Sequence, residues 1–346
     1  MMQSNNHDRH NKKTKWPIIA VICILLAASI PLTAYGLFSF YYSKLNIQPV
    51  ESGHTVSPAE PDDTDTVAGA VPEESSLPYD AENVYNILLI GTDARDADQR
   101  SRSDTMIIVS INRETKHIIM TSIMRDIYCK IPGKGENRIN SAHAYGGAAL
   151  LLDTIEYNFG IHIDDYITIN FYGFMNAIDA IGGVPMEVSA AEIDVMNFYI
   201  RELNFLLGAE AETDILREED AGKLLLNGKQ ALAYSRIRYV GNADFERTER
   251  QRDLLTVLMG KTKSLSLPEL GSLMNTVLPC ITTSLTQGEI LSLLFHAGEY
   301  LNYEIVSDRI PIEGSWQEAR IDGMSVLEID FAENRAHWQK QVYGDN

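Results

Sequence analysis

Three apolar runs between Asn86 and Asp126 constrain the fold more than any other part of this 346-residue sequence. They read N-I-L-L-I-G-T-D-A-R, R-S-D-T-M-I-I-V-S-I-N and I-I-M-T-S-I-M-R-D. Each run is rich in β-branched residues and has aspartate and arginine at one end, which predicts three β-strands. We expect the strand ends to bring the following charged residues into one neighbourhood: Asp93, Arg95, Arg102, Asp104, Arg125 and Asp126.

The charged residues at these strand ends allow two interpretations. Carboxylate oxygens suit a divalent metal ion, and arginines suit a ligand that carries phosphate. The same residues could instead form surface ion pairs around the edge of a sheet, where such pairs contribute little to stability. The three runs taken alone do not decide between a binding site and surface pairs.

The N-terminal part of the sequence predicts a membrane anchor. Residues 1–16 carry four basic side chains and one acidic side chain, a net charge of +3. From Trp16 to Tyr42 there is no charged residue, and this run exceeds the roughly 20 apolar residues that span a bilayer. We expect a cytoplasmic basic segment at 1–16 and an uncleaved transmembrane helix at 17–42, with the rest of the chain outside the cell. A cleaved signal peptide is the alternative, but A-A-S at 27–29 is a poor cleavage site.

An acidic, proline-containing segment follows the predicted anchor. Residues 46–80 contain five prolines among Glu, Asp, Ser and Thr and almost no large apolar side chain. Such a segment cannot bury enough surface to fold. We therefore predict a disordered extracellular linker at 43–82 and a folded extracellular domain at 83–346. The hydrophobic content of 45% supports a core, and the net charge of −19 argues against non-specific binding to nucleic acid.

Strands and helices alternate along the predicted folded domain, as in an α/β layered domain. After the three strands, hydrophobic periodicity, caps and Gly signals predict these elements: a helix at 141–158, a strand at 166–170, a helix at 172–181, a strand at 184–188, a helix face at 193–206, a helix capped by Asn227, a helix at 244–262, a helical region at 267–301, strands at 303–312 and 325–330, and a terminal helix at 331–342.

A second group of arginines stands out in this acidic protein. Arg236 and Arg238 are two residues apart, so both guanidinium groups point to the same face if the segment is extended. Arg247 and Gln251 follow on a predicted helix that Asp244 is placed to cap. Arginine binds phosphate through two parallel hydrogen bonds. The alternative is a solvated helix face on which the arginines pair with neighbouring glutamates.

These segments together resemble the LytR–CpsA–Psr family of bacterial cell-wall enzymes. The family usually has proline where Met124 stands, a change that leaves the charges of the site intact. The stretch at 190–222 is longer and more acidic than the usual connection, which affects the acceptor or glycan side. The matching segments occur in family order over about 85–251: G-T-D-A-R (91–95), R-S-D-T-M (102–106), S-I-M-R-D (122–126), R-I-N-S-A-H-A-Y-G-G (138–147), D-A-I-G-G-V (179–184), L-N-G-K-Q-A-L-A-Y-S-R-I-R (226–238) and D-F-E-R-T-E-R-Q (244–251).

The resemblance implies a three-layer α/β/α sandwich with a central mixed β-sheet, preceded by one transmembrane helix. The catalytic domain is then the folded part at 83–346. The implied activity is transfer of a glycopolymer, of the teichoic acid or capsular polysaccharide type, from a polyprenyl pyrophosphate carrier onto a peptidoglycan sugar hydroxyl. Polyprenyl phosphate is released, and Mg²⁺ or Mn²⁺ is required. A pyrophosphatase using the same site and a non-enzymatic regulator that binds an anionic ligand are the alternatives.

The resemblance also implies roles for individual residues. Asp93 and Asp104 are expected to hold the metal ion. Asp93 is our choice of general base, with His143 as a rival, and Asp126 either orients an arginine or touches substrate. The apolar faces of helices at 148–159, 172–181 and 253–259 either line a tunnel for the prenyl tail or form plain core. The remaining assignments are a catalytic set of Asp93, Arg95, Arg102 and Arg125, and a pyrophosphate-binding set of Arg102, Arg125, Arg236, Arg238, Arg247 and Gln251.

Overall fold

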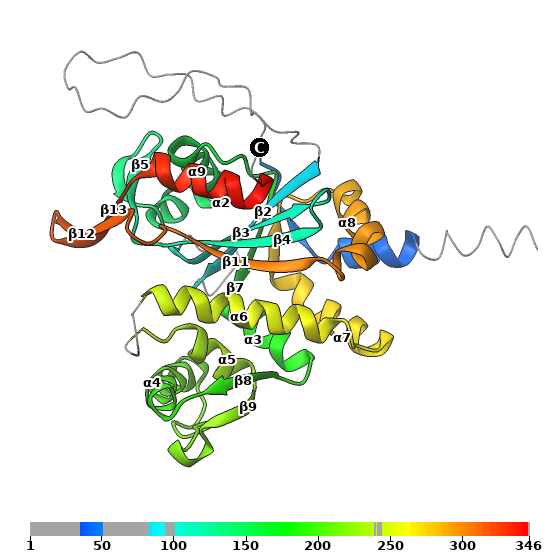
Figure 1. The fold of residues 1–346 in the computed structure, drawn as a ribbon. Helices are drawn as coiled ribbons and strands as arrows, with labels where there is room; N and C mark the ends of the chain where they lie inside the picture. The colour runs from blue at the N-terminus through cyan, green and yellow to red at the C-terminus, as the bar shows by residue number, and fades with distance from the viewer. Residues whose placement is uncertain (1–34, 51–82, 94–100, 239, 241–243, 345–346) are drawn as a thin grey trace, which may run out of the picture. The chain divides into compact units, whose positions relative to one another are not determined.

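The computed structural model describes residues 35–50, 83–93, 101–238, 240 and 244–344 (Figure 1). The chain divides into two compact units, one up to Lys44 and one from Leu45 onwards. In the first unit the structure describes a helix over residues 35–42. Within the described ranges, no helix is long and apolar enough to cross a membrane. Most of the predicted anchor at 17–42 and of the predicted linker lies outside the described residues.

A seven-stranded mixed sheet, counted over the residues that the structure describes, forms the middle layer of the second unit. The neighbouring strands β2, β3 and β4 run antiparallel, while β7 is parallel to β2 and β11 is parallel to β4. The three strands predicted at the start of the domain are confirmed. In sheet order the strands are β1 (Asn46–Ile47), β10 (Ile281–Thr283), β7 (Asp165–Asn170), β2 (Val84–Thr92), β3 (Ser103–Asn112), β4 (His117–Ile123) and β11 (Glu304–Ile310).

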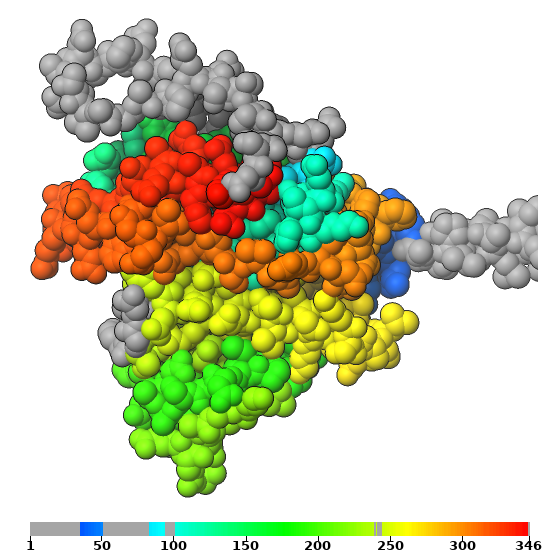
Figure 2. All heavy atoms as spheres, in the orientation of Figure 1, coloured from blue at the N-terminus to red at the C-terminus, as the bar shows by residue number. Residues whose placement is uncertain are grey.

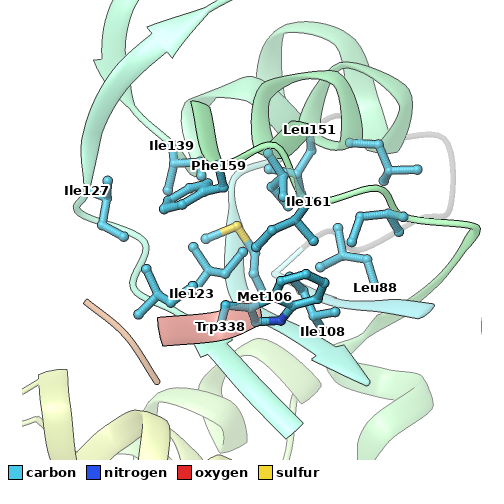
Figure 3. Packing of buried hydrophobic residues seen from close by; sticks show 14 of the residues in the cluster. Leu88, Met106, Ile108, Ile123, Ile127, Ile139, Leu151, Phe159, Ile161 and Trp338 are labelled. Atoms are coloured by element: carbon cyan, nitrogen blue, oxygen red, sulfur yellow. The ribbon is translucent and has the colours of Figure 1, made fainter. Parts of the chain in front are cut away.

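Helices cover both faces of this sheet, as Figure 1 shows, so the α/β class with a mixed central sheet is confirmed. The strands that face α2 and α9 are buried on both sides of the sheet, because alternate residues of a strand point to opposite faces. Met106 and Ile108 of β3 join the core beneath α2 and α9 (Figure 3), whereas Ile107 and Ile111 join the cluster that includes residues of α6 and α8. The helices are α2 (Ser141–Phe159), α3 (Phe171–Ala180), α4 (Ala190–Leu207), α5 (Gly228–Ser235), α6 (Asp244–Thr262), α7 (Leu267–Val277), α8 (Gln287–Tyr300) and α9 (Phe331–Tyr343).

Three antiparallel strand pairs lie outside the main sheet in the described part of the chain. They are β5 (Tyr128–Ile131) with β6 (Gly135–Arg138), β8 (Val184–Val188) with β9 (Gly222–Leu226), and β12 (Trp316–Ile321) with β13 (Met324–Ile329). Strands β8 and β9 pack with α4, α5 and part of α6 around a second apolar cluster. Figure 2 shows this part of the protein, in green, extending from the α6 side of the sheet.

Two sequence predictions are wrong at the edge of the main sheet. The region at 267–301 is not continuously helical, because a short 3-10 turn at Leu278–Cys280 and strand β10 separate α7 from α8. Pro279 lacks the N–H that a continuing helix requires, and the β-branched residues of β10 pair with β7 instead. Within the predicted linker, Asn46 and Ile47 form β1, which pairs with β10. Strands β5, β6, β9 and β12 were not predicted.

Gly228 lets α5 approach the last turns of α3. A Cβ at this position would lie 2.2 Å from the carbonyl oxygen of Met175, and the Gly228 N–H donates to Asp179 Oδ1 at 2.7 Å. We expect Gly228→Ala to lower the free energy of unfolding by about 2 kcal/mol or more, because backbone must move to admit the methyl group. Urea denaturation measures the change.

Gly260→Ala is the matched control, because Gly260 lies in α6 with nothing within 4 Å of an added Cβ. Alanine is favoured over glycine inside a helix by about 1 kcal/mol, so this variant should be as stable as the wild type or more so. Equal stability of the two variants would contradict the close approach of α5 and α3.

Candidate active site

The strand ends that the sequence predicts to converge do meet at one edge of the sheet. Strand β2 ends at Thr92 opposite Ser103, where the antiparallel strand β3 begins. Strand β4 is antiparallel to β3, so its C-terminal end also lies at this edge, and β7 ends there at Asn170 opposite Thr92. This topology brings together Asp93, Asp104 and Arg125 from three different strand ends.

A cavity of about 720 Å³ opens at this edge, and we call it the polar pocket. Its charged lining consists of Asp93, Arg102, Asp104, Arg125, Arg138, Glu202 and Arg236. Phe171 and Tyr172 of α3 and the C-terminal part of α4, including Leu203, complete its walls. The stretch at 190–222, whose length departs from the family pattern, therefore supplies one side of the pocket.

Arg125 lies at the centre of the charge network. Its Nη1 donates to Asp104 Oδ1 at 2.6 Å, and its Nε lies 3.4 Å from Asp126 Oδ2. Burial lowers the pKa of Arg125, but the carboxylates of Asp104, Asp126 and Asp244 outweigh burial and hold that pKa above its ordinary value. Asp126 also accepts a hydrogen bond from Arg138 Nη1 at 2.9 Å, so it contacts two arginines of the pocket.

Arg236 reaches the polar pocket from a different backbone conformation than the one predicted. Arg236 ends helix α5 with φ −100° and ψ −5°, so the segment is not extended there. The premise that places it on one face with Arg238 is therefore wrong. The Arg236 guanidinium pairs with Glu202 at 3.1 Å and lies 4.6 Å from the Tyr199 ring centroid. Arg238 instead pairs with Asp244 at 3.5 Å.

Arg247 and Gln251 lie on α6 without lining the polar pocket. Arg247 is only 2% exposed and its Nη1 is 2.9 Å from Asp244 Oδ1. Burial lowers the pKa of Arg247 to about 10, despite the opposing effect of Asp244, and nearby Arg125 and Arg238 lower it further. Gln251 donates to the carbonyl of Ser235 at 3.3 Å. Phosphate contacts by these two residues remain predictions.

The other predicted residues divide between the pocket and the interior. Arg102 is exposed and lines the polar pocket. Arg95 lies outside the described residues. His143 is buried, its Nδ1 is 2.8 Å from the carbonyl oxygen of Ser101, and burial lowers its pKa. It is therefore a packed side chain that does not line the polar pocket, which favours Asp93 over His143 as the proposed base.

Two pocket residues were missed by sequence reasoning. Arg138 and Asn140 both line the polar pocket, at the junction between β6 and α2. Ile139 between them is fully buried, and Asn140, at the N-cap of α2, is itself only 2% exposed. The two residues lie in a matched family segment, R-I-N-S-A-H-A-Y-G-G, but the backbone turns at Ile139 and Asn140, so strand alternation could not have identified them.

The carboxylates that line the polar pocket fit a magnesium site. Asp93 and Asp104 both face this cavity, and each offers the hard oxygen ligands that Mg²⁺ prefers. Among the described residues, no group of three or more His, Cys, Asp or Glu side chains could hold a metal ion. Two carboxylates leave coordination positions for phosphate oxygens and water, the pattern in which Mg²⁺ usually binds.

An apolar cavity of about 150 Å³ adjoins the polar pocket. It lies between β2, β3 and β7 on one side and α3, α5 and α6 on the other, and Phe171 lines both cavities. Of the three helices predicted to line such a tunnel, α3 and α6 do so, the latter through Leu254 and Leu255. The segment at 148–159 belongs to α2, which packs on the other face of the sheet, so of the two alternatives for this segment plain core is the one observed.

The comparisons with known proteins agree with this geometry. A model of the LytR_cpsA_psr family matches residues 40–342. The chain belongs to the LytR–CpsA–Psr family. One relative, 31% identical over 333 residues, is the polyisoprenyl-teichoic acid–peptidoglycan teichoic acid transferase TagU of Oceanobacillus iheyensis; the match covers 91% of this chain and 93% of that protein.

Solved structures of the family share the fold. The structure of TagT bound to LI-WTA has a TM-score of 0.60 at 25% identity, covering 77% of this chain and 93% of that chain. The structure of YwtF (TagT) with bound octaprenyl pyrophosphate lipid has a TM-score of 0.56 at 24% identity, with 77% and 93% covered.

Asp244 is the counter-charge of the buried Arg247. We expect Asp244→Asn to lower the free energy of unfolding by about 2 to 3 kcal/mol, because it leaves an unpaired guanidinium in a desolvated position. Urea denaturation near neutral pH measures this loss. Asp253→Asn, at an exposed position of the same helix, should leave stability unchanged. Wild-type stability of Asp244→Asn would show that other carboxylates compensate the charge of Arg247.

Proposed function

We propose that this protein transfers a glycopolymer, together with one phosphate, from a polyprenyl pyrophosphate carrier to a sugar hydroxyl of peptidoglycan. The observation that carries this proposal is that Phe171 lines two cavities of different character. One is lined by four arginines, and the other is lined mainly by apolar side chains. A ligand with an anionic head and a long apolar tail matches this pair of surfaces.

The relatives support the same ligand class. TagU of Oceanobacillus iheyensis is named as a teichoic acid transferase that acts from a polyisoprenyl carrier to peptidoglycan, and TagT is described as bound to LI-WTA. A protein of the same fold, YwtF (TagT), is described with bound octaprenyl pyrophosphate lipid. These names favour a polymer of the teichoic acid type over a capsular polysaccharide.

The prenyl tail is placed in the apolar cavity. The volume of about 150 Å³ is smaller than a polyprenyl chain, so α3, α5 and α6 have to separate from the sheet as the tail enters. These helices face this cavity through apolar side chains such as Phe174, Leu232 and Leu254. Separation of α6 from the sheet would also break the hydrogen bond from Arg252 to Ser122 of β4. The pyrophosphate then lies at the Phe171 end of the polar pocket.

The reaction exchanges one phosphorus–oxygen bond for another. The acceptor hydroxyl oxygen attacks the phosphorus that bears the glycopolymer, and the bond from this phosphorus to the bridging oxygen breaks. The bridging oxygen leaves with polyprenyl phosphate, and the hydroxyl proton passes to a base and then to solvent. Catalysis of such a transfer rests mainly on positioning and on neutralising the charge of the phosphate oxygens.

The arginines of the polar pocket are held in place before the substrate binds. Arg125 is fixed by Asp104, and Arg236 is fixed by Glu202 and by the rings of Tyr199 and Phe171. Guanidinium groups that are already oriented need little reorganisation when charge develops on the transferred phosphoryl group. This preorganisation is the contribution of the fold to the rate.

Asp93 is the proposed general base. Within the described part of the chain, three carboxylates line the polar pocket, and two of them are paired with arginines: Asp104 with Arg125 and Glu202 with Arg236. Asp93 has no ion pair with another described residue, and this singles it out as the base, a role that competes with metal ligation for the same carboxylate. Asp93 and Asp104 would also hold Mg²⁺ or Mn²⁺, which supplies charge neutralisation at the phosphate oxygens.

The location of the reaction follows from the N-terminal sequence. We place residues 1–16 in the cytoplasm and residues 17–42 across the membrane, with the catalytic domain outside. This arrangement gives the domain access to a carrier lipid in the membrane and to the cell wall.

Variants of the polar pocket test the proposal. We expect Arg236→Ala and Asp104→Asn each to reduce transfer by about a hundredfold or more. The first removes a guanidinium that neutralises the pyrophosphate, and the second removes the carboxylate that positions Arg125. The assay uses the full-length protein in detergent, a lipid-linked glycopolymer, a peptidoglycan acceptor and Mg²⁺. Arg201→Ala is the matched control, since among the described residues Arg201 pairs with exposed Glu212 and neither side chain lines the pocket. Wild-type rates in both pocket variants would overturn the proposal.

The nature of the product separates the transferase from its alternatives. With both substrates and Mg²⁺ present, we expect polymer-linked peptidoglycan and polyprenyl phosphate in equal amounts, as mass spectrometry and phosphate analysis can show. A pyrophosphatase would accumulate free phosphorylated glycan whether or not the acceptor is added. A binding protein with a regulatory role would retain the lipid and give no product.

A further inference from the structure

A third cavity, of about 320 Å³, shares lining residues with the polar pocket, and we call it the side pocket. Arg125 and Arg138 line both the side pocket and the polar pocket, while Phe171 lines the polar pocket and the apolar cavity. The polar pocket therefore has the apolar cavity at one boundary and the side pocket at another. The proposed function assigns no ligand to the side pocket.

The β12–β13 hairpin forms the outer wall of the side pocket. Strand β11 ends at the same sheet edge as β4, so the chain that follows enters the hairpin beside the active site. The N–H of Leu327 donates to the carbonyl of Asp126 at 2.9 Å, which attaches the hairpin to the segment that carries Arg125. Trp316 and Glu318 alternate along β12 and both line the side pocket. Figure 2 shows the hairpin, in orange, at the surface beside α6, in yellow.

Two aromatic rings form a platform in this pocket. Phe245 of α6 and Trp316 of β12 have ring centroids 4.6 Å apart, and the Arg309 guanidinium lies 4.3 Å from the Phe245 centroid. Both rings are partly buried against the main core, which fixes their position. A rigid, partly exposed indole is suited to pack against the apolar face of a ring-shaped ligand.

The charged residues around the platform select a neutral ligand that carries hydroxyl groups. Asp126, Asp244 and Glu318 line the side pocket together with the two shared arginines. Carboxylates accept hydrogen bonds from hydroxyl groups and repel anions. Asp126 and Asp244 are already paired with arginines, so Glu318 is the carboxylate to which a hydroxyl would donate. A sugar ring can pack on the platform and donate to Glu318, whereas a polyanionic glycopolymer is disfavoured by Glu318 at the exposed rim.

The side pocket offers the acceptor an approach that the apolar cavity does not line. In phosphoryl transfer the attacking and leaving oxygens lie roughly in line across the phosphorus. With the prenyl phosphate leaving toward the apolar cavity, the acceptor has to approach from another side of the polar pocket. The side pocket meets the polar pocket at Arg125 and Arg138, which would bind the phosphoryl group between the two.

We propose that the side pocket is the acceptor subsite, which binds an N-acetylhexosamine ring of peptidoglycan between Trp316 and Glu318 and directs a hydroxyl toward the polar pocket. This inference rests on the proposed function for the identity of the acceptor. The occupant of the pocket, a pyranose ring, could come from the acceptor or from the donor polymer, and the kinetics of the two substrates distinguish these sources.

The test compares Trp316→Ala and Glu318→Gln with the wild-type, full-length protein in detergent. Glu318 is exposed, so its variant should fold even where loss of the Trp316 ring disturbs the core. We expect Glu318→Gln to raise the KM for a short soluble peptidoglycan strand by about tenfold and to leave the donor KM unchanged, since a charge-assisted hydrogen bond is lost. Glu328→Gln is the control, because Glu328 bonds Gln317 on the opposite face of the hairpin.

A direct binding measurement separates this inference from the proposed function. The anisotropy of a fluorescently labelled peptidoglycan strand should show weaker binding to Glu318→Gln than to wild type or Glu328→Gln. That result without any transfer by the wild type would support the subsite and overturn the transferase. Transfer by the wild type with equal acceptor KM in all variants, or a raised donor KM alone, would overturn the subsite and leave the transferase standing.

Discussion

The ion pair between Arg125 and Asp104 is the interaction on which the site depends. It joins the start of β3 to the chain after β4 at the sheet edge, and Arg125 lines both the polar pocket and the side pocket. Arginines brought this close repel one another, and burial adds to the free-energy cost of their charge. Asp104, Asp126 and Asp244 offset that repulsion, so the protein can assemble a cationic cluster before any anionic ligand arrives.

Helix α6 connects the parts of the domain that surround this cluster. Its first turns carry Arg247, close to Arg125, and its next turns carry Leu254 and Leu255, which line the apolar cavity. Arg250 pairs with Glu192 of α4 at 2.8 Å, and Arg252 donates to Ser122 of β4 at 2.7 Å. Movement of α6 to admit a prenyl tail is therefore coupled to the arginine cluster and to the wall of the polar pocket that α4 supplies.

Local signals account for what the sequence predicts correctly, and long-range packing accounts for the rest. The long apolar runs of β2, β3 and β4 and the capping box at Asn227 are visible in a few consecutive residues. Three-residue β10 has no such signal, because its partners β7 and β1 define it. Distant segments determine how deeply Arg247 is buried, where the chain turns at Arg236 and which carboxylate pairs with each arginine. Spacing along the sequence could therefore show that these residues belong to one site, but it could not show where each side chain lies in that site.

The difference between a transferase and a hydrolase on this scaffold depends on the acceptor. Water reaches the exposed Asp93 as easily as any sugar does, and it is present at far higher concentration. A hydroxyl competes with water only when binding holds it next to the phosphorus, which raises its effective concentration by orders of magnitude. The arginines and carboxylates of the polar pocket stabilise either reaction equally. A site that holds a sugar ring beside Arg125 and Arg138 is therefore a physical requirement of the transferase, and the aromatic platform of the hairpin meets it.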